Sequence, residues 1–339
     1  MSMKSNMFML MILFFILFSM SSSTWWSMWV GMELTGFMFS CWLAFYETPK
    51  MKLKVFIYFI IQLISSSAFF MSNIMMSHLN NSFMVYLNSY SLMMKMGGFP
   101  FHTWMFSIIE NLDYKKFFFL MTMMKLIPMA AMNMTEFTQL FLLTSLGGMF
   151  LAPSSYQLGS LRLILTYSSI IHISWMILAL KQSKLLFLFY FSCYMILMFM
   201  IIKILILQFN KMSKLKELMS IYLSPSTLMI WLISIYSMIG IPPFLMFYPK
   251  FWVINFLMES NQWIYSLIII IMSFLPVYFY SKFVFMVALN TKMMMKHYFY
   301  KKVTMPFFFF FFLFFFFIFF FFFLKKFFLK KKFFLFFLK

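Results

Sequence analysis

The sequence predicts an all-α polytopic membrane protein with about eleven transmembrane helices. Hydrophobic residues make up 64% of its 339 residues and charged residues only 10%, whereas soluble domains are about half apolar and about one quarter charged. A single soluble core cannot bury so much apolar surface. Disordered chains are poor in aromatic residues, which form 24% of this chain. Both a soluble globular protein and a disordered one are therefore excluded.

Eleven segments are apolar over a length close to the ~20 residues that cross a bilayer as a helix. The connections between them are short and leave no room for a soluble domain. The first segment has no small-residue cleavage site and a second one follows directly, so we expect a retained helix instead of a signal peptide. The segments are residues 6–22, 25–46, 55–75, 83–105, 117–133, 137–153, 161–180, 185–208, 225–247, 263–288 and 306–324.

Glycine and proline interrupt two of these regions. Gly97–Pro100 interrupts the fourth segment, in KMGGFPFHTW, and Gly240–Pro249 interrupts the ninth, in GIPPFLMFYPK. Interrupted helices in corresponding halves are typical of transporters built from inverted repeats, because the freed backbone groups are tolerated where they line a polar cavity. Lys95 precedes the first interruption and Lys250 follows the second, which is the order expected of inverted repeats. The alternative is two ordinary kinks beside incidental lysines.

The interruptions and the composition predict two domains. Residues 1–290 would form a membrane domain with inverted repeats at about 1–133 and 137–290, and residues 291–339 would form a C-terminal helix and a basic tail. Phe307–Leu324 is almost entirely phenylalanine and has no polar face, so we expect it to span the membrane. The alternative is a segment that lies along the interface. The lysines after it would suit anionic lipid headgroups such as those of cardiolipin.

The basic residues predict the orientation and the compartment. A net charge of +20 would indicate nucleic acid in a soluble protein, but here the lysines gather near the ends of predicted helices, so we predict no nucleic-acid partner. Lys50–Lys54, Lys115–Lys116 and Lys211–Lys216 would share one side with the N-terminus, and only Lys181 and Lys184 would lie opposite before the last helix. The basic side is the inner side. The excess of lysine, phenylalanine and methionine fits an A/T-rich animal mitochondrial genome, which predicts the mitochondrial inner membrane with the N-terminus in the matrix.

Four ionisable residues are not explained by a place at a helix end: Glu33, Lys95, Lys125 and Lys250. Glu33 and Lys125 lie mid-helix, where a side chain cannot easily reach water, and Lys95 and Lys250 lie beside the two interruptions. Such residues are costly in a membrane and indicate functional sites by default. Burial disfavours the charged form of a lysine and a nearby carboxylate favours it, so a lysine under both influences can bind and release protons. We predict that the four residues form a proton relay, in which Glu33 pairs with Lys95.

Glycine and proline residues support two of these assignments. Gly31 and Gly36 flank Glu33 and would let another helix approach closely. Pro128 follows Lys125 and would loosen the hydrogen bonds of its helix. We therefore expect tight helix packing beside the glutamate and an irregular backbone beside the central lysine.

Two histidines are weaker candidates for the relay. His102 and His172 lie in apolar stretches, where the alternative is a neutral histidine hydrogen-bonded in a polar core. Lys203 and Lys282 lie near helix ends, from which lysine stems can reach the headgroups, so we expect structural roles for them. The sequence contains no metal-ligand spacing, no phosphate-binding glycine loop and no nucleophile triad, which predicts no cofactor or metal in this chain.

The motifs also resemble those of a known family. WVGMELTGF, KMGGFPFHTW, MMKLIP, SLRLILTYSSIIHISWM and GIPPFLMFYPKFWV occur in this order over about residues 25–285, and together they resemble the antiporter-like membrane subunits of respiratory complex I. By this resemblance, the family's glutamate falls on Glu33 and its three lysines fall on Lys95, Lys125 and Lys250. The family is built from two inverted five-helix repeats, with the N-terminus in the matrix.

The resemblance implies a subunit that moves protons while partner subunits of the membrane arm and its neighbours pass electrons from NADH to ubiquinone. NADH, FMN, iron–sulfur clusters and ubiquinone would be bound by those partners. Protons would enter near Lys95, pass Lys125 and leave by way of Lys250. Leu163 replaces a usual second basic residue, and Met246 lies where a glycine is expected. Two alternatives stay open: a stand-alone cation/proton antiporter with the same lysines, and a helical scaffold whose charges have no function.

Overall fold

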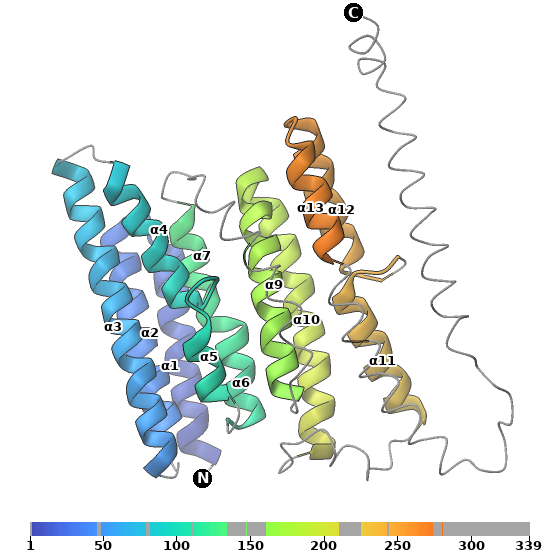
Figure 1. Ribbon diagram of the computed structural model, residues 1–339. Helices are drawn as coiled ribbons and strands as arrows, with labels where there is room; N and C mark the ends of the chain where they lie inside the picture. Colours follow the sequence, from blue (N-terminus) through green and yellow to red (C-terminus); the bar gives the residue numbers. More distant parts are fainter. Residues whose placement is uncertain are drawn as a thin grey trace, which may run out of the picture. The chain divides into compact units, whose positions relative to one another are not determined.

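The computed structural model describes most of the chain and forms one compact unit over the described residues. Every regular element in this part is a helix, which confirms the all-α fold, and the long helices run alongside one another (Figure 1). The described residues are 2–45, 49–78, 82–109, 112–133, 147, 161–209, 225–242, 244–273 and 280. Nearly all of the predicted segment 137–153, the segment 306–324 with its basic tail, and Lys282 lie outside these ranges.

The first three helices match the first three predicted segments. They are α1 (Ser2–Ser21), α2 (Trp25–Ala44) and α3 (Pro49–His78), and α2 packs against both of the others. A helix of 20 residues is about 30 Å long, which is the thickness of the hydrocarbon core of a bilayer. The α2 helix begins where the Thr24 hydroxyl accepts a hydrogen bond from the backbone N–H of Ser27.

The two glycines beside Glu33 behave differently. A Cβ added to Gly31 would lie 2.5 Å from the Cβ of Ser19 on α1, so the close helix approach predicted there is confirmed. At Gly36 the prediction is wrong, because a Cβ added there would meet nothing within 4 Å among the described residues. Sequence spacing cannot tell these glycines apart, because only the direction from which α1 approaches α2 decides which of them is needed.

The fourth predicted segment is a broken helix, as expected. It consists of α4 (Ser82–Met96) and α5 (Thr103–Ile109). The break starts at Gly97, whose φ of 65° is strained for any residue with a side chain. The N–H of Gly97 donates to the carbonyl of Met94 at 3.2 Å and that of Gly98 to Met93 at 3.0 Å, the pair of bonds that ends a helix as a Schellman motif.

The fifth segment is also interrupted, at Lys125. It consists of α6 (Tyr114–Met121), the short 3₁₀ helix η1 (Met123–Lys125) and α7 (Leu126–Met132). Pro128 has no N–H to donate to the carbonyl four residues earlier, so the regular helix cannot continue unchanged through this turn. The irregular backbone predicted beside Lys125 is therefore confirmed.

The remaining described helices contain the second predicted break. Gly240 follows α11 with a φ of 85°, and the chain becomes helical again at Phe247. The second half-helix runs to Glu259, well beyond the predicted end at residue 247. The prediction ended too early because Pro249 and Lys250 lower the hydropathy of that stretch. These helices are α9 (Leu161–Gln182), α10 (Lys184–Phe209), α11 (Pro225–Ile239), α12 (Phe247–Glu259) and α13 (Trp263–Ser273).

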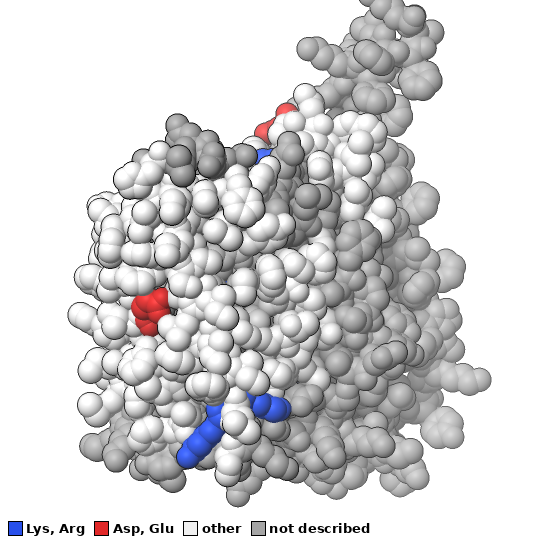
Figure 2. All heavy atoms as spheres, turned by 60° about the vertical axis from the view of Figure 1, so that its left-hand side comes forward, with Lys and Arg blue, Asp and Glu red and all other residues white. Residues whose placement is uncertain are grey.

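Exposed apolar side chains cover the outer helices. On α1, Leu10, Phe14 and Leu17 share one face and are 66%, 63% and 70% exposed. Figure 2 shows that the described surface on this side is mostly uncharged, with one acidic patch about halfway up and basic side chains near its lower edge. Such a surface is stable in lipid and not in water.

Three of the described helices are individually long and apolar enough to cross a membrane. They contain Met51–Met76, Arg162–Gln182 and Lys184–Ile206. The helices that carry Lys95, Lys125 and Lys250 are divided by their breaks, so each half is shorter than a membrane span.

Candidate functional site

Lys125 is the central residue of the candidate site. It ends η1 and is only 1% exposed, and its Nζ has no hydrogen-bond partner among the described residues. On one side α7 packs against α1, α2 and α4, and on the other α6 packs against α10. A buried ammonium without a partner is costly, so this position favours a group that can give up its proton.

Lys250 lies at the second break. Its Nζ donates hydrogen bonds to the carbonyls of Ile239, at 2.7 Å, and Met238, at 3.5 Å, which belong to the last turn of α11. Those carbonyls have no partner within their own helix and carry the negative end of its dipole. The ammonium also lies over the ring of Trp175 on α9, 5.6 Å from its centroid. The break in the helix thus creates the binding site for this cation.

Gly240 makes room for Lys250. A Cβ added to it would lie 2.9 Å from Cδ of Lys250 and 3.0 Å from its Nζ. The positive φ and the close lysine therefore both require glycine here.

Lys95 lies on the last turn of α4, directly before the first break, and is 7% exposed. Its backbone carbonyl accepts a hydrogen bond from Nε2 of Gln62 on α3 at 3.3 Å. The indole N–H of Trp104 on α5 donates across the break to the carbonyl of Met94 at 3.2 Å. The charge of Glu33 on α2 acts on Lys95, without a direct ion pair between these two described side chains. Side chains of α3 and α5 therefore hold the end of this half-helix.

His172 lies near both Lys125 and Lys250. It lies on α9, is 3% exposed and is close enough to both Lys250 and Lys125 for their charges to act on it. Its Nδ1 is 2.9 Å from the hydroxyl of Tyr190 on α10, which is also buried. The ring of Tyr194, one turn further along α10, lies 5.2 Å from the imidazole.

The two tyrosines on α10 were not predicted as site residues. The Tyr194 hydroxyl donates to the carbonyl of Met121 at 3.3 Å, directly before the turn that carries Lys125. Tyr190 and Tyr194 therefore link His172 on α9 to the interruption between α6 and η1. The available sequence signal is weak: two tyrosines four residues apart in a helix otherwise rich in Phe, Leu and Met.

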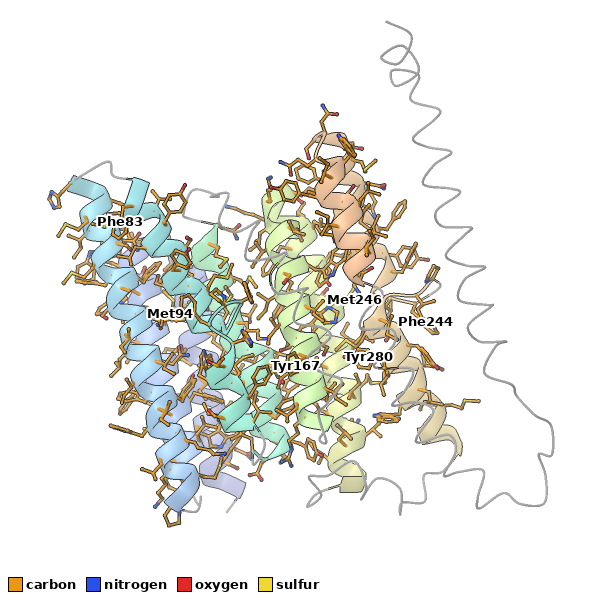
Figure 3. The ribbon with its side chains drawn as sticks, in the orientation of Figure 1. Phe83, Met94, Tyr167, Phe244, Met246 and Tyr280 are labelled. Carbon is orange, nitrogen blue, oxygen red and sulfur yellow. The ribbon has the colours of Figure 1, made fainter. Side chains whose placement is uncertain are left out.

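The two breaks lie at similar heights in the bundle. In Figure 3, Met94 on α4 and Met246 before α12 lie on either side of α9, which carries Tyr167. The three lysines predicted to form the relay therefore each lie at a helix interruption, and all three belong to one compact unit.

His102 is separate from this arrangement. It lies in the break between α4 and α5, stacked on Phe99 with ring centroids 6.1 Å apart and packed against Phe106 at 5.5 Å. Within the described residues no hydrogen bond joins it to the lysines. Lys203 is exposed, as expected for a lysine that reaches the headgroups, and lies 5.9 Å from the ring centroid of Phe199.

Two basic residues near helix ends, Lys116 and Arg162, are buried. Lys116 is 6% exposed and donates to the carbonyls of Leu43 and Phe45 at the end of α2, at 3.3 and 3.4 Å. Arg162 is 8% exposed and lies 4.6 Å above the ring centroid of Tyr114. These contacts attach α6 to α2 and to α9 and so fix the helix that leads to Lys125. In the described part of the chain, no three His, Cys, Asp or Glu side chains gather as a metal site would require.

Comparison with known proteins agrees with the geometry. Residues 22–276 match the family described as NADH:quinone oxidoreductase/Mrp antiporter, TM. The chain is 28% identical to NADH-ubiquinone oxidoreductase chain 2 of Anopheles gambiae over 82% of this chain and 84% of that one. It is 30% identical to the protein of the same name from Artemia franciscana, over 80% and 86%.

A solved structure has the same fold. A chain of respiratory complex I from Thermus thermophilus, determined with bound aureothin, superposes with a TM-score of 0.76 at 18% identity, over 84% of this chain and 70% of that one. The family match covers the segments that carry all four predicted relay residues. The chain therefore belongs to the NADH:quinone oxidoreductase/Mrp antiporter transmembrane family, with relatives named NADH-ubiquinone oxidoreductase chain 2.

Proposed function

We propose that the chain is a proton-translocating subunit in the membrane arm of respiratory complex I, in the mitochondrial inner membrane with its N-terminus in the matrix. The observation that carries this proposal is Lys125, a buried lysine without a hydrogen-bond partner among the described residues, at a helix interruption near a second buried lysine and a histidine. The names of the relatives support the assembly. Partner subunits bind NADH, FMN, iron–sulfur clusters and ubiquinone, and pass the electrons.

Protons move along the buried residues in chain order. A proton enters from the matrix near Lys95, whose affinity responds to the charge of Glu33. It crosses to Lys125, passes His172 and leaves by way of Lys250. His172 suits the step between the lysines because an imidazole can accept a proton at one nitrogen and release one from the other. The carbonyls of Ile239 and Met238 hold the ammonium of Lys250 when the proton arrives.

The proposed assembly is tested by the size of the particle that contains the chain. Mitochondrial membranes are solubilised and separated on a native gel, which is stained for NADH dehydrogenase activity and analysed by mass spectrometry. The chain is expected in the band that carries this activity. A free chain that exchanges sodium for protons in vesicles would instead identify a stand-alone antiporter.

Tyr190→Phe tests the role of His172. The substitution keeps the ring and removes the hydroxyl that contacts Nδ1, which leaves a buried ring nitrogen unsatisfied at a cost of about 1–3 kcal/mol. We expect fewer protons moved per NADH and a changed pH profile of pumping, with the assembled complex still present. The measurement is proton uptake into vesicles alongside NADH oxidation.

A double-substitution cycle separates this effect from a general loss of packing. Tyr190→Phe is expected to have no further effect in a His172→Ala background, because the two groups act through one hydrogen bond. Tyr248→Phe is the matched control, since Tyr248 is 53% exposed on α12. Additive effects of the two substitutions would show that Tyr190 does not act through His172.

A further inference from the structure

The helices α3 and α4 face each other with polar side chains that are buried or half-buried. Gln62 and Asn73 on α3 and Asn88, Ser91 and Lys95 on α4 form what we call the α3–α4 seam. Its two ends are fixed by hydrogen bonds between the helices: Gln62 Nε2 to the carbonyl of Lys95 at 3.3 Å, and Asn88 Nδ2 to Asn73 Oδ1 at 3.2 Å. Residues 88, 91 and 95 are three, four and seven positions apart and therefore share one face of α4. The seam thus extends about 10 Å along α4 from Lys95.

The hydrogen bonds of the two asparagines leave one oxygen without a donor. Asn73 Nδ2 donates to the carbonyl of Phe69 at 2.7 Å, so its Oδ1 faces Asn88 as an acceptor. Asn88 must then present its Nδ2, which donates to Asn73 and contacts Sδ of Met76 at 3.7 Å. Its Oδ1 is left buried, with no partner among the described residues, in a side chain that is 0% exposed.

An asparagine pair between membrane helices usually stabilises their association. That role explains the bond from Asn88 to Asn73, but it does not explain the unpaired oxygen. Leaving a buried acceptor without a donor costs about 1–3 kcal/mol, and such groups are rare in native proteins. The seam therefore lacks a donor at Asn88 Oδ1.

The neighbouring groups determine what that donor is. The hydroxyl of Ser91 donates to the carbonyl of Asn88 at 2.6 Å, so toward the seam it offers only an acceptor. The ammonium of Lys95 offers only donors and lies two helical turns from Asn88. Water both donates and accepts, and an ordered buried water needs two to four polar partners of this kind.

We propose that ordered water occupies the α3–α4 seam between Asn88 and Lys95 and gives Lys95 a second proton connection, toward the end of the bundle where α3 ends and α4 begins. The inference rests on the proposed function, in which Lys95 carries a proton. Figure 1 shows the end of α3 and the start of α4 at the end of the bundle opposite the N-terminus. With the N-terminus in the matrix, the connection leads toward the outer side. A proton that leaves Nζ for the adjacent water is matched by one that leaves that water for the next, so the charge on each water is restored.

The direct test is a density map of the assembled complex, at a resolution that shows water. A water peak within hydrogen-bond distance of Asn88 Oδ1 and a second between Ser91 and Lys95 are expected. Asn88→Leu removes the first peak and lowers the number of protons moved per NADH. Ser89→Ala is the matched control, a substitution of a serine on α4 that is 1% exposed and lies next to Asn88; it leaves both unchanged.

Either of two results overturns the inference. One is a map in which Asn88 Oδ1 accepts from a protein or lipid group and the seam holds no water. The other is Asn88→Leu with unchanged pumping. The density map does not depend on the proton relay, so the two proposals can fail independently. If the map shows water in the seam but Lys125→Met pumps normally, the proposed function is wrong while the water in the seam stands.

Discussion

Lys125→Met will stop proton transfer through this subunit while the complex still assembles. Methionine has nearly the shape of the lysine stem but no titratable group. A positioned side chain that transfers a proton contributes about 100-fold or more to the rate, so the rate through this path should fall by at least ~100-fold. The fold should tolerate the change, because replacing an unpaired buried charge with an apolar side chain is often neutral or stabilising. Protons moved per NADH, measured in vesicles, will fall while electron transfer is at least partly retained.

Two further substitutions distinguish proton transfer from charge alone. Lys125→Arg keeps a positive charge that cannot be released in a protein, so it should fail like Lys125→Met. Lys203→Met removes an exposed lysine on α10 and should pump like the unchanged protein. If Lys125→Arg pumps normally, Lys125 supplies a fixed charge and no proton. Normal pumping after neutral substitutions at Glu33, Lys95, Lys125 and Lys250 together would favour the structural scaffold.

Gly240→Ala will destabilise the second break and displace Lys250. Alanine at a φ of 85° costs about 1–2 kcal/mol. Its Cβ would also lie 2.9 Å from Cδ and 3.0 Å from Nζ of Lys250. The lysine must then move from the carbonyl of Ile239. We expect a lower temperature of thermal unfolding of the purified complex and a lower ratio of protons to NADH.

Gly36→Ala is the matched control for this prediction. A Cβ at Gly36 meets nothing within 4 Å among the described residues, and Gly36 lies inside α2. Alanine in the interior of a helix is favoured over glycine by about 0.5–1 kcal/mol, so Gly36→Ala should be neutral or slightly stabilising. If both variants unfold at the same temperature, the conformation of Gly240 and its distance to Lys250 have no energetic importance.

The helix breaks give the lysines different surroundings, which suggests a division of labour. Lys250 is held by two carbonyls of a half-helix end, whereas Lys125 has no such partner among the described residues. The ammonium of Lys250 is therefore fixed in place by hydrogen bonds, whereas no described group fixes that of Lys125. Loss of the proton from Lys250 would leave an amine that can still donate to Ile239, but through a weaker, uncharged hydrogen bond. The charge state of Lys250 is thus linked to the strength of the contact that holds the break.

Much of the fold was predictable because its signals are local. Apolar length predicts the helices, and Gly97–Pro100 and Gly240–Pro249 predict the two breaks, since glycine and proline act on their own backbone. The end of the second broken helix was not predictable from hydropathy. Its second half runs to Glu259 because a polar residue such as Lys250 is paired by neighbouring helices, and a hydropathy window does not include those partners.

The candidate residues were predictable in kind but not in their contacts. A charge such as Lys125 within an apolar segment stands out in any sequence, because lipid excludes it. Lys116 was predicted only to lie near a helix end, and its burial became apparent only when α6 and α2 were packed together. Gly36 was misread as a close-packing position, since a Cβ added to it would meet nothing within 4 Å among the described residues.

The sequence by itself determined that this is an all-α membrane protein, where two of its helices break, and which charges lie within them. Tertiary structure alone decided that Tyr190 contacts His172 and that Asn88 faces Asn73 across a seam. The physical reason is range. Hydropathy, glycine and proline act within a few residues of themselves, whereas these hydrogen bonds join residues 18 and 15 positions apart on different helices and depend on how the helices are turned toward each other.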